Sequence, residues 1–155
     1  MESNQNPQNS PQPQQNDSNY TSYNEFAAEV RRYKSNIALD VVFVILTCGI
    51  YDLFWQYRQM KFVNYLLQET KFSFLRWFIF MILTCGLYNL FHQYVMAKDI
   101  VSIQGKYSLE KSQDLPAISV VMSVVSVGII ADAIQQYEMN QIIDRLTMNT
   151  GYATY

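Results

Sequence analysis

The chain has 155 residues, a formal net charge of −2 at pH 7 and charged side chains at 15% of its positions. That length suits one domain, and the charged fraction lies well below the ~25% of an average soluble domain. A weakly acidic chain lacks the basic surface that binds nucleic acid, so we expect no nucleic-acid partner.

The chain begins with residues 1–22, which are mostly Gln, Asn, Pro and Ser. This composition buries too little apolar surface to offset the loss of chain entropy, so it predicts a disordered tail or a tail that docks through its prolines. Asn24 is a candidate N-cap for a helix from Glu25 to about Ser35. This helix has an apolar and a basic face, which suits a membrane surface or ordinary packing.

Three uncharged apolar segments follow, at 41–51, 77–97 and 115–131. As helices they would be roughly 16, 31 and 26 Å long, and only the second matches the ~30 Å hydrocarbon core of a bilayer. Each segment runs into an amphipathic stretch with apolar residues at helical spacing. We therefore expect an all-α, membrane-embedded domain over 23–148, followed by a short tail at 149–155.

The segments share a sequence box that spans residues 46–57, returns at 83–94, and has a more divergent copy at 125–137. The motif positions are Thr47, Gly49, Tyr51, Asp52, Trp55, Gln56 and Tyr57 in the first copy, Thr84, Gly86, Tyr88, Asn89, His92, Gln93 and Tyr94 in the second, and Gly128, Asp132, Gln136 and Tyr137 in the third. Self-similarity at a fixed period indicates repeated structural units. We expect three units of apolar helix, Gly-containing joint and amphipathic helix, at about 37–69, 72–104 and 115–148.

The first box reads Thr-x-Gly-Ile-Tyr-x-Leu-Phe-Trp-x-Tyr from Thr47 to Tyr57, and it resembles a family of small prokaryotic membrane proteins of unknown function. The second copy departs from this box with Leu87 in place of Ile and His92 in place of Trp, and the third copy retains little of it. The resemblance covers about residues 35–148. It implies a helical fold and a membrane location, and it implies no activity.

Asp52, Asn89 and Asp132 occupy one shared position of the three copies. Polar groups at the edges of apolar segments line an ion or proton path, or they mark the interface and hydrogen-bond neighbouring helices. His92 is the only histidine, so we expect no metal site. As the counterpart of Trp55 it is expected at the membrane interface.

The joints contain Cys48 and Cys85, which we expect to be buried, reduced thiols. The glycines beside them, Gly49 and Gly86, permit either close helix approach or a left-handed turn. The sequence has no phosphate-binding loop and no nucleophile–base motif. We therefore expect no enzymatic activity and no cofactor.

The topology has two alternatives. Three spanning helices would place successive boxes in opposite leaflets, and Lys and Arg would then be enriched only on alternate flanks. Every flank of the three segments is basic, which favours a hairpin that enters from the cytoplasm and bends near residues 47–49. The second segment alone is long enough to cross, which favours spanning.

These expectations describe an integral protein of a prokaryotic plasma (inner) membrane that works as an interaction or scaffold protein of the cell envelope. Its partners would be the lipid bilayer and another membrane protein or a second copy of itself. The alternative is a small channel or transporter subunit in which Asp52, Asn89 and Asp132 line a polar path.

Overall fold

The computed structural model describes residues 17–126 and 128–148, which form seven helices and no strand. These helices are α1 (Asp17–Arg31), α2 (Ile37–Leu46), α3 (Ile50–Leu67), α4 (Phe74–Leu83), α5 (Leu87–Lys106), α6 (Leu115–Ser126) and α7 (Ile129–Met148). The expected all-α class is confirmed for this part of the chain. Helix α1 begins earlier than expected, so residues 17–22 of the expected tail are helical, whereas 1–16 and 149–155 lie outside the described residues.

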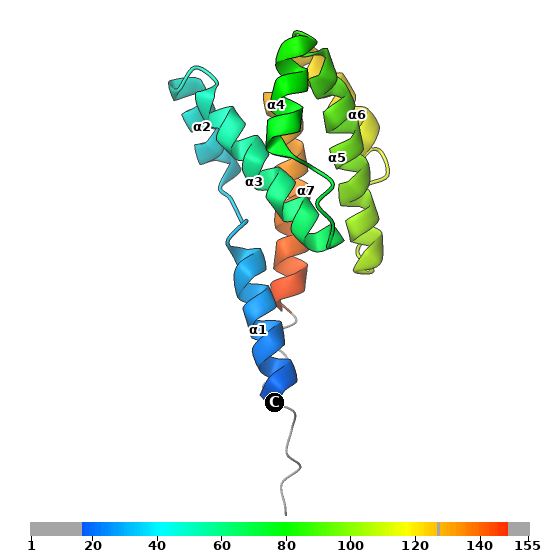
Figure 1. The fold of residues 1–155 in the computed structure, drawn as a ribbon. Helices are drawn as coiled ribbons and strands as arrows, with labels where there is room; N and C mark the ends of the chain where they lie inside the picture. The colour runs from blue at the N-terminus through cyan, green and yellow to red at the C-terminus, as the bar shows by residue number, and fades with distance from the viewer. Residues whose placement is uncertain (1–16, 127, 149–155) are drawn as a thin grey trace, which may run out of the picture.

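Six of these helices pair into three hairpins, each with a short apolar helix followed by a longer helix (Figure 1). Helix α2 turns into α3, α4 into α5, and α6 into α7. The uncharged run at 77–97 is therefore two helices rather than one, because α4 ends at Leu83 and α5 begins at Leu87. Across the described ranges, no helix combines the length and the apolar character needed to cross a membrane.

A Thr-Cys-Gly sequence forms the turn of the first two hairpins. Gly49 and Gly86 have φ angles of +91° and +89°, a left-handed conformation that glycine adopts at little cost. A Cβ atom at either position would meet nothing within 4 Å, so backbone conformation rather than close packing selects glycine there. Of the two roles expected for these glycines, the structure adopts the left-handed turn.

The threonine of each turn links the two helices of its hairpin. Thr47 Oγ1 donates to the carbonyl of Phe43 (2.7 Å) and accepts from the N–H of Tyr51 (2.9 Å). Thr84 makes the equivalent two bonds at the same distances. One side chain therefore helps to end the first helix and begin the second.

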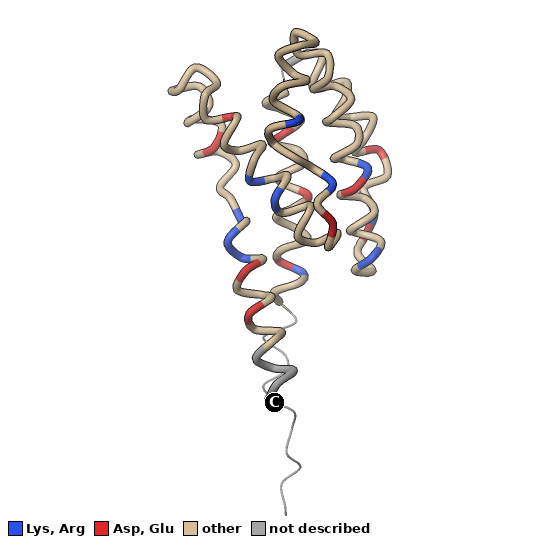
Figure 2. The backbone as a smooth tube through the Cα atoms, in the orientation of Figure 1, with Lys and Arg blue, Asp and Glu red and all other residues tan. Residues whose placement is uncertain are grey.

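The hydrophobic core lies between the long helices, at their ends remote from the turns. Helices α3, α5 and α7 contact one another there, and α1 packs along α7. Side chains with no more than 1% exposure include Met60, Val63, Leu66, Met96, Ile100, Ile103, Met139, Ile142 and Ile143. Lys, Arg, Asp and Glu lie mostly around this end and along α1, whereas the turns of the hairpins carry none (Figure 2).

Candidate functional site

The turns present large apolar side chains to the outside. Leu46 and Ile50 flank the first turn and are each 72% exposed. Leu83 and Leu87 flank the second turn and are each 71% exposed, and Val125 beside the third is 75% exposed. Exposed apolar surface that is gathered in one region marks contact with a membrane or another protein.

The three turns surround one cavity of about 560 Å³. Its walls are mostly apolar and include Val44, Leu53, Met81, Leu87, Val124 and Ile129. Asp52 and Asn89 line it as well. A Cβ atom on Gly128 would lie 3.2 Å from Asn89 Nδ2 and 3.8 Å from Asp132 Oδ2, so Asp132 is close by. The structure therefore brings together the three polar residues that share one position of the sequence box.

Asp132 is the centre of a buried polar cluster and is only 1% exposed. Its Oδ1 atom accepts hydrogen bonds from the side-chain amides of Gln93 (2.6 Å) and Gln56. Its backbone carbonyl accepts from Gln59 Nε2 (3.0 Å). One residue of α7 therefore receives amide donors from α3 and α5, which ties the three long helices together.

Asp52 faces Asp132 across this cluster, close enough for the charge on Asp52 to act on the Asp132 carboxyl group. Burial raises the pKa of Asp52, and burial together with the nearby Asp52 carboxylate raises the pKa of Asp132 well above its usual range. Two carboxylates close to each other in a buried site do not both ionise at low cost, so burial and their mutual repulsion favour protonation within the pair.

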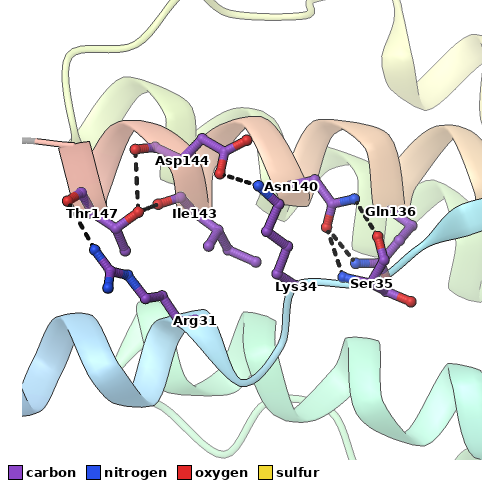
Figure 3. A network of polar contacts seen from close by, with 8 residues as sticks. All are labelled: Arg31, Lys34, Ser35, Gln136, Asn140, Ile143, Asp144 and Thr147. Atoms are coloured by element: carbon purple, nitrogen blue, oxygen red, sulfur yellow. Dashed lines mark hydrogen bonds and ion pairs between the residues drawn. The ribbon is translucent and has the colours of Figure 1, made fainter.

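A second set of amides extends the cluster toward α1. Gln136 Oε1 accepts from Trp55 Nε1 (3.1 Å), and Gln136 Nε2 donates to Asn140 Oδ1 (3.1 Å). Asn140 in turn exchanges two hydrogen bonds with the backbone of Ser35 (Figure 3). An ion pair between Lys34 and an acidic residue of α7 lies one turn further along. The segment that links α1 to α2 is therefore fixed to α7.

The remaining motif residues lie around the cluster. Trp77 Nε1 donates to Asn89 Oδ1 (3.1 Å), and Tyr51 donates to an oxygen of Asp40 (2.7 Å). Tyr88 packs against Phe80 with ring centroids 5.1 Å apart. The closing tyrosines of the three boxes, Tyr57, Tyr94 and Tyr137, are exposed and do not join the cluster.

Two expectations are wrong, namely the burial of the cysteines and the interfacial position of His92. Cys48 and Cys85 are free thiols but exposed rather than buried, because they occupy the apex of each turn. His92, expected at an interface, is 4% exposed and packs against the rings of Phe72 and Trp77. Its counterpart Trp55 is also fully buried, and its indole N–H donates to Gln136 within the cluster.

The buried His92 makes stability depend on pH. Burial lowers the pKa of His92 from 6.5 to about 4, so the unfolded chain takes up a proton below pH 6.5 while the folded chain does not. The contribution of His92 to the free energy of unfolding is therefore fully present above pH 6.5, and it is lost as the pH falls toward 4. We expect the free energy of unfolding to fall by about 2 kcal/mol between pH 7 and pH 5 through this residue.

Denaturant unfolding in a neutral detergent at both pH values measures this effect, with His92→Phe as the comparison. The Asp52–Asp132 pair changes the free energy of unfolding in the opposite direction, because its raised pKa values stabilise the folded state as the pH falls. The variant should therefore gain stability at pH 5 relative to pH 7. A variant that loses as much stability as the unsubstituted chain would show that His92 is not responsible.

Several residues of the cluster were not among the predicted site residues. Gln59, Gln135 and Asn140 lie outside the recurring box positions, yet each contributes hydrogen bonds to the cluster. Gln135 Nε2 donates to Gln93 Oε1 (2.7 Å) and to Ser119 Oγ (3.1 Å). Helical spacing was the available signal for Gln59, which falls one turn after Gln56 on the same face.

The fold and the cluster define an all-helical protein in which a buried amide and carboxyl cluster holds three apolar-tipped hairpins together. Residues 72–147, which are 76 of the 155 positions, match a family described as a domain of unknown function (DUF4234). The matched range covers the second and third hairpins almost completely. No curated protein and no solved structure matches the chain.

Proposed function

We propose that this chain is a protein of the prokaryotic plasma membrane that inserts its three hairpin turns into one leaflet from one side. The observation that carries the proposal is the exposure of the apolar residues at the turns, such as Leu83 and Leu87. All three turns surround one cavity, so they lie at the same end of the molecule. The proposal favours the hairpin topology over three spanning helices.

The length of the short helices supports this depth of insertion. Helices α2 and α4 have 10 residues each, which corresponds to about 15 Å. That is half of the ~30 Å hydrocarbon core, so each hairpin reaches approximately the middle of the bilayer. The charged ends of the hairpins would then remain at the headgroups.

Backbone polar groups in contact with lipid need partners within the protein, and the N–H groups of the first two turns have them. Each N–H from Thr47 to Asp52 is bonded within the turn, either to a carbonyl or to Thr47 Oγ1. The same holds from Thr84 to Asn89. A turn in water has no such requirement, because solvent satisfies its free donors.

The work of the protein is proposed to be that of an interaction or scaffold protein of the cell envelope, rather than that of an enzyme. The amides of the buried cluster mostly bond to one another and to Asp132, which suits a structural role. Its partners would be the bilayer and a second membrane protein or another copy of the chain.

A small channel or transporter subunit is the second candidate. It is favoured by the placement of Asp52 and Asn89 on the wall of the cavity, with Asp132 next to them. Proton flux into liposomes that contain the protein and a pH-sensitive dye distinguishes the two. A flux that Asp132→Asn abolishes would support the channel, and a flux equal to that of empty liposomes would support the scaffold.

Membrane insertion is tested by flotation of the full chain with neutral phosphatidylcholine vesicles, followed by alkaline carbonate extraction. We expect the protein to float with the vesicles and to stay with them at alkaline pH, because apolar burial does not depend on surface charge. Recovery of the protein in the carbonate supernatant would overturn the proposal.

A further inference from the structure

A small cavity of about 140 Å³ lies at the base of the second hairpin, where the segment after α3 meets α4. The polar side chains of Lys71, Ser73 and Arg76 line its outer part. Trp77 and Phe91 continue the lining toward the turn of the hairpin. The cavity therefore has cationic side chains at its opening and aromatic rings further in. This arrangement suits a ligand with an anionic headgroup and an apolar body.

The N-terminus of α4 opens at this cavity and lacks the usual cap. Ser73 occupies the N-cap position, but its side chain makes no capping bond, and the first turn has no acidic residue. In the first hairpin, by contrast, Asn36 caps α2 through a bond from the N–H of Leu39, and Asp40 lies in the first turn. Free N–H groups and the helix dipole favour an anion at the uncapped end.

A buried side chain with unused polar atoms lines the same cavity. His92 is 4% exposed, and neither of its ring nitrogens has a hydrogen-bond partner among the described residues. Buried polar atoms of native proteins are normally paired, so this ring is a candidate donor to a ligand. Lys71 is already paired with Asp99 at 2.6 Å. The exposed Arg76 donates to the Lys71 carbonyl (3.4 Å) but has no ion-pair partner among the described residues, so it is the main uncompensated charge at the cavity.

We infer that this cavity binds the phosphate headgroup of an anionic phospholipid, with Arg76, Ser73 and the first amides of α4 as its contacts. The inference rests on the proposed membrane insertion. Helix α4 spans about 15 Å from its turn to this end, so insertion of the turn to mid-bilayer places the cavity at the level of the headgroups. The first part of an acyl chain would then lie along Trp77 and Phe91.

The single histidine provides a specific reporter. The full chain, labelled with ¹⁵N-histidine in a neutral detergent, is titrated with dihexanoyl phosphatidylglycerol, and the His92 signal is followed by NMR. We expect a saturable shift and a rise in the pKa of His92, because a nearby anion favours the protonated ring. Inorganic phosphate should bind more weakly, since it has no apolar body to contact the aromatic wall.

Arg76→Gln is the test variant, and Arg32→Gln, an exposed arginine paired with Glu29 on α1, is the matched control. We expect Arg76→Gln to weaken binding of the lipid roughly three- to tenfold and the control to leave it unchanged. No saturable shift, equal binding by Arg76→Gln, or equal binding of inorganic phosphate would each overturn the inference. Because the short lipid is soluble, these outcomes do not depend on flotation with phosphatidylcholine vesicles, which tests membrane insertion separately.

Discussion

Replacing Leu83 with aspartate is expected to weaken binding to neutral phosphatidylcholine vesicles by a factor of about 100 to 1,000. Leu83 is 71% exposed beside the turn of the second hairpin, where the proposed depth is greatest. Leucine favours the centre of a bilayer and aspartate opposes it, and the difference is about 3–4 kcal/mol on insertion scales. Aspartate is also too short to carry its charge back to the interface, as lysine does.

The matched control is Met148→Asp. Met148 is an apolar residue at the far end of α7, and its side chain is 59% exposed. This position lies away from the turns, so we expect vesicle binding to change little. Both variants are compared by co-sedimentation over a range of lipid concentrations. Equal losses for Leu83→Asp and Met148→Asp would contradict the assignment of the turns as the inserted surface.

Asp132→Leu is expected to destabilise the fold by about 3–5 kcal/mol. The change removes the acceptor of the Gln56 and Gln93 amides, and each buried donor left without a partner costs about 1–3 kcal/mol. Asp132→Asn keeps an oxygen for both amides and offers an N–H to Asp52. We therefore expect the asparagine variant to lose less than about 1 kcal/mol.

Denaturant unfolding of both variants in a neutral detergent at pH 7 measures this difference. The comparison separates the hydrogen-bonding role of Asp132 from its charge, because asparagine retains the first and removes the second. Similar stabilities for Asp132→Leu and Asp132→Asn would show that the buried cluster does not hold the three hairpins together.

The sequence indicated the positions of the joints between helices, but not the conformation of the turns at those joints. The box with Thr47 and Gly49 marked a joint, and the uncharged segments marked apolar helices. The absence of charge over 77–97 nevertheless suggested one long helix, because a charge count does not register a turn whose donors are all bonded internally. The left-handed backbone at Cys48 and Cys85 also gave no signal, since cysteine does not favour it.

The candidate site was also predictable only in part. Asp52, Asn89 and Asp132 share a box position, and equivalent positions of packed hairpins can meet at a common centre. Gln135 and Asn140 were not predicted as site residues, because they belong to one hairpin only and depend on how α7 packs against α5 and the segment after α1. Those contacts are set by tertiary packing, which local patterns do not encode.

The proposed position of the turns within the bilayer is tested most directly through the two native cysteines. Cys48 and Cys85 are exposed at the apices of two turns and are the only cysteines of the chain. Each is spin-labelled alone, with the other changed to serine, in liposomes. A label at Ser108→Cys in the exposed segment between α5 and α6, with both native cysteines changed to serine, serves as the reference.

We expect labels at 48 and 85 to be relaxed by dissolved oxygen and shielded from a water-soluble nickel chelate, with the reverse at 108. Access of the chelate to 48 and 85 equal to that at 108 would contradict the proposed position of the turns.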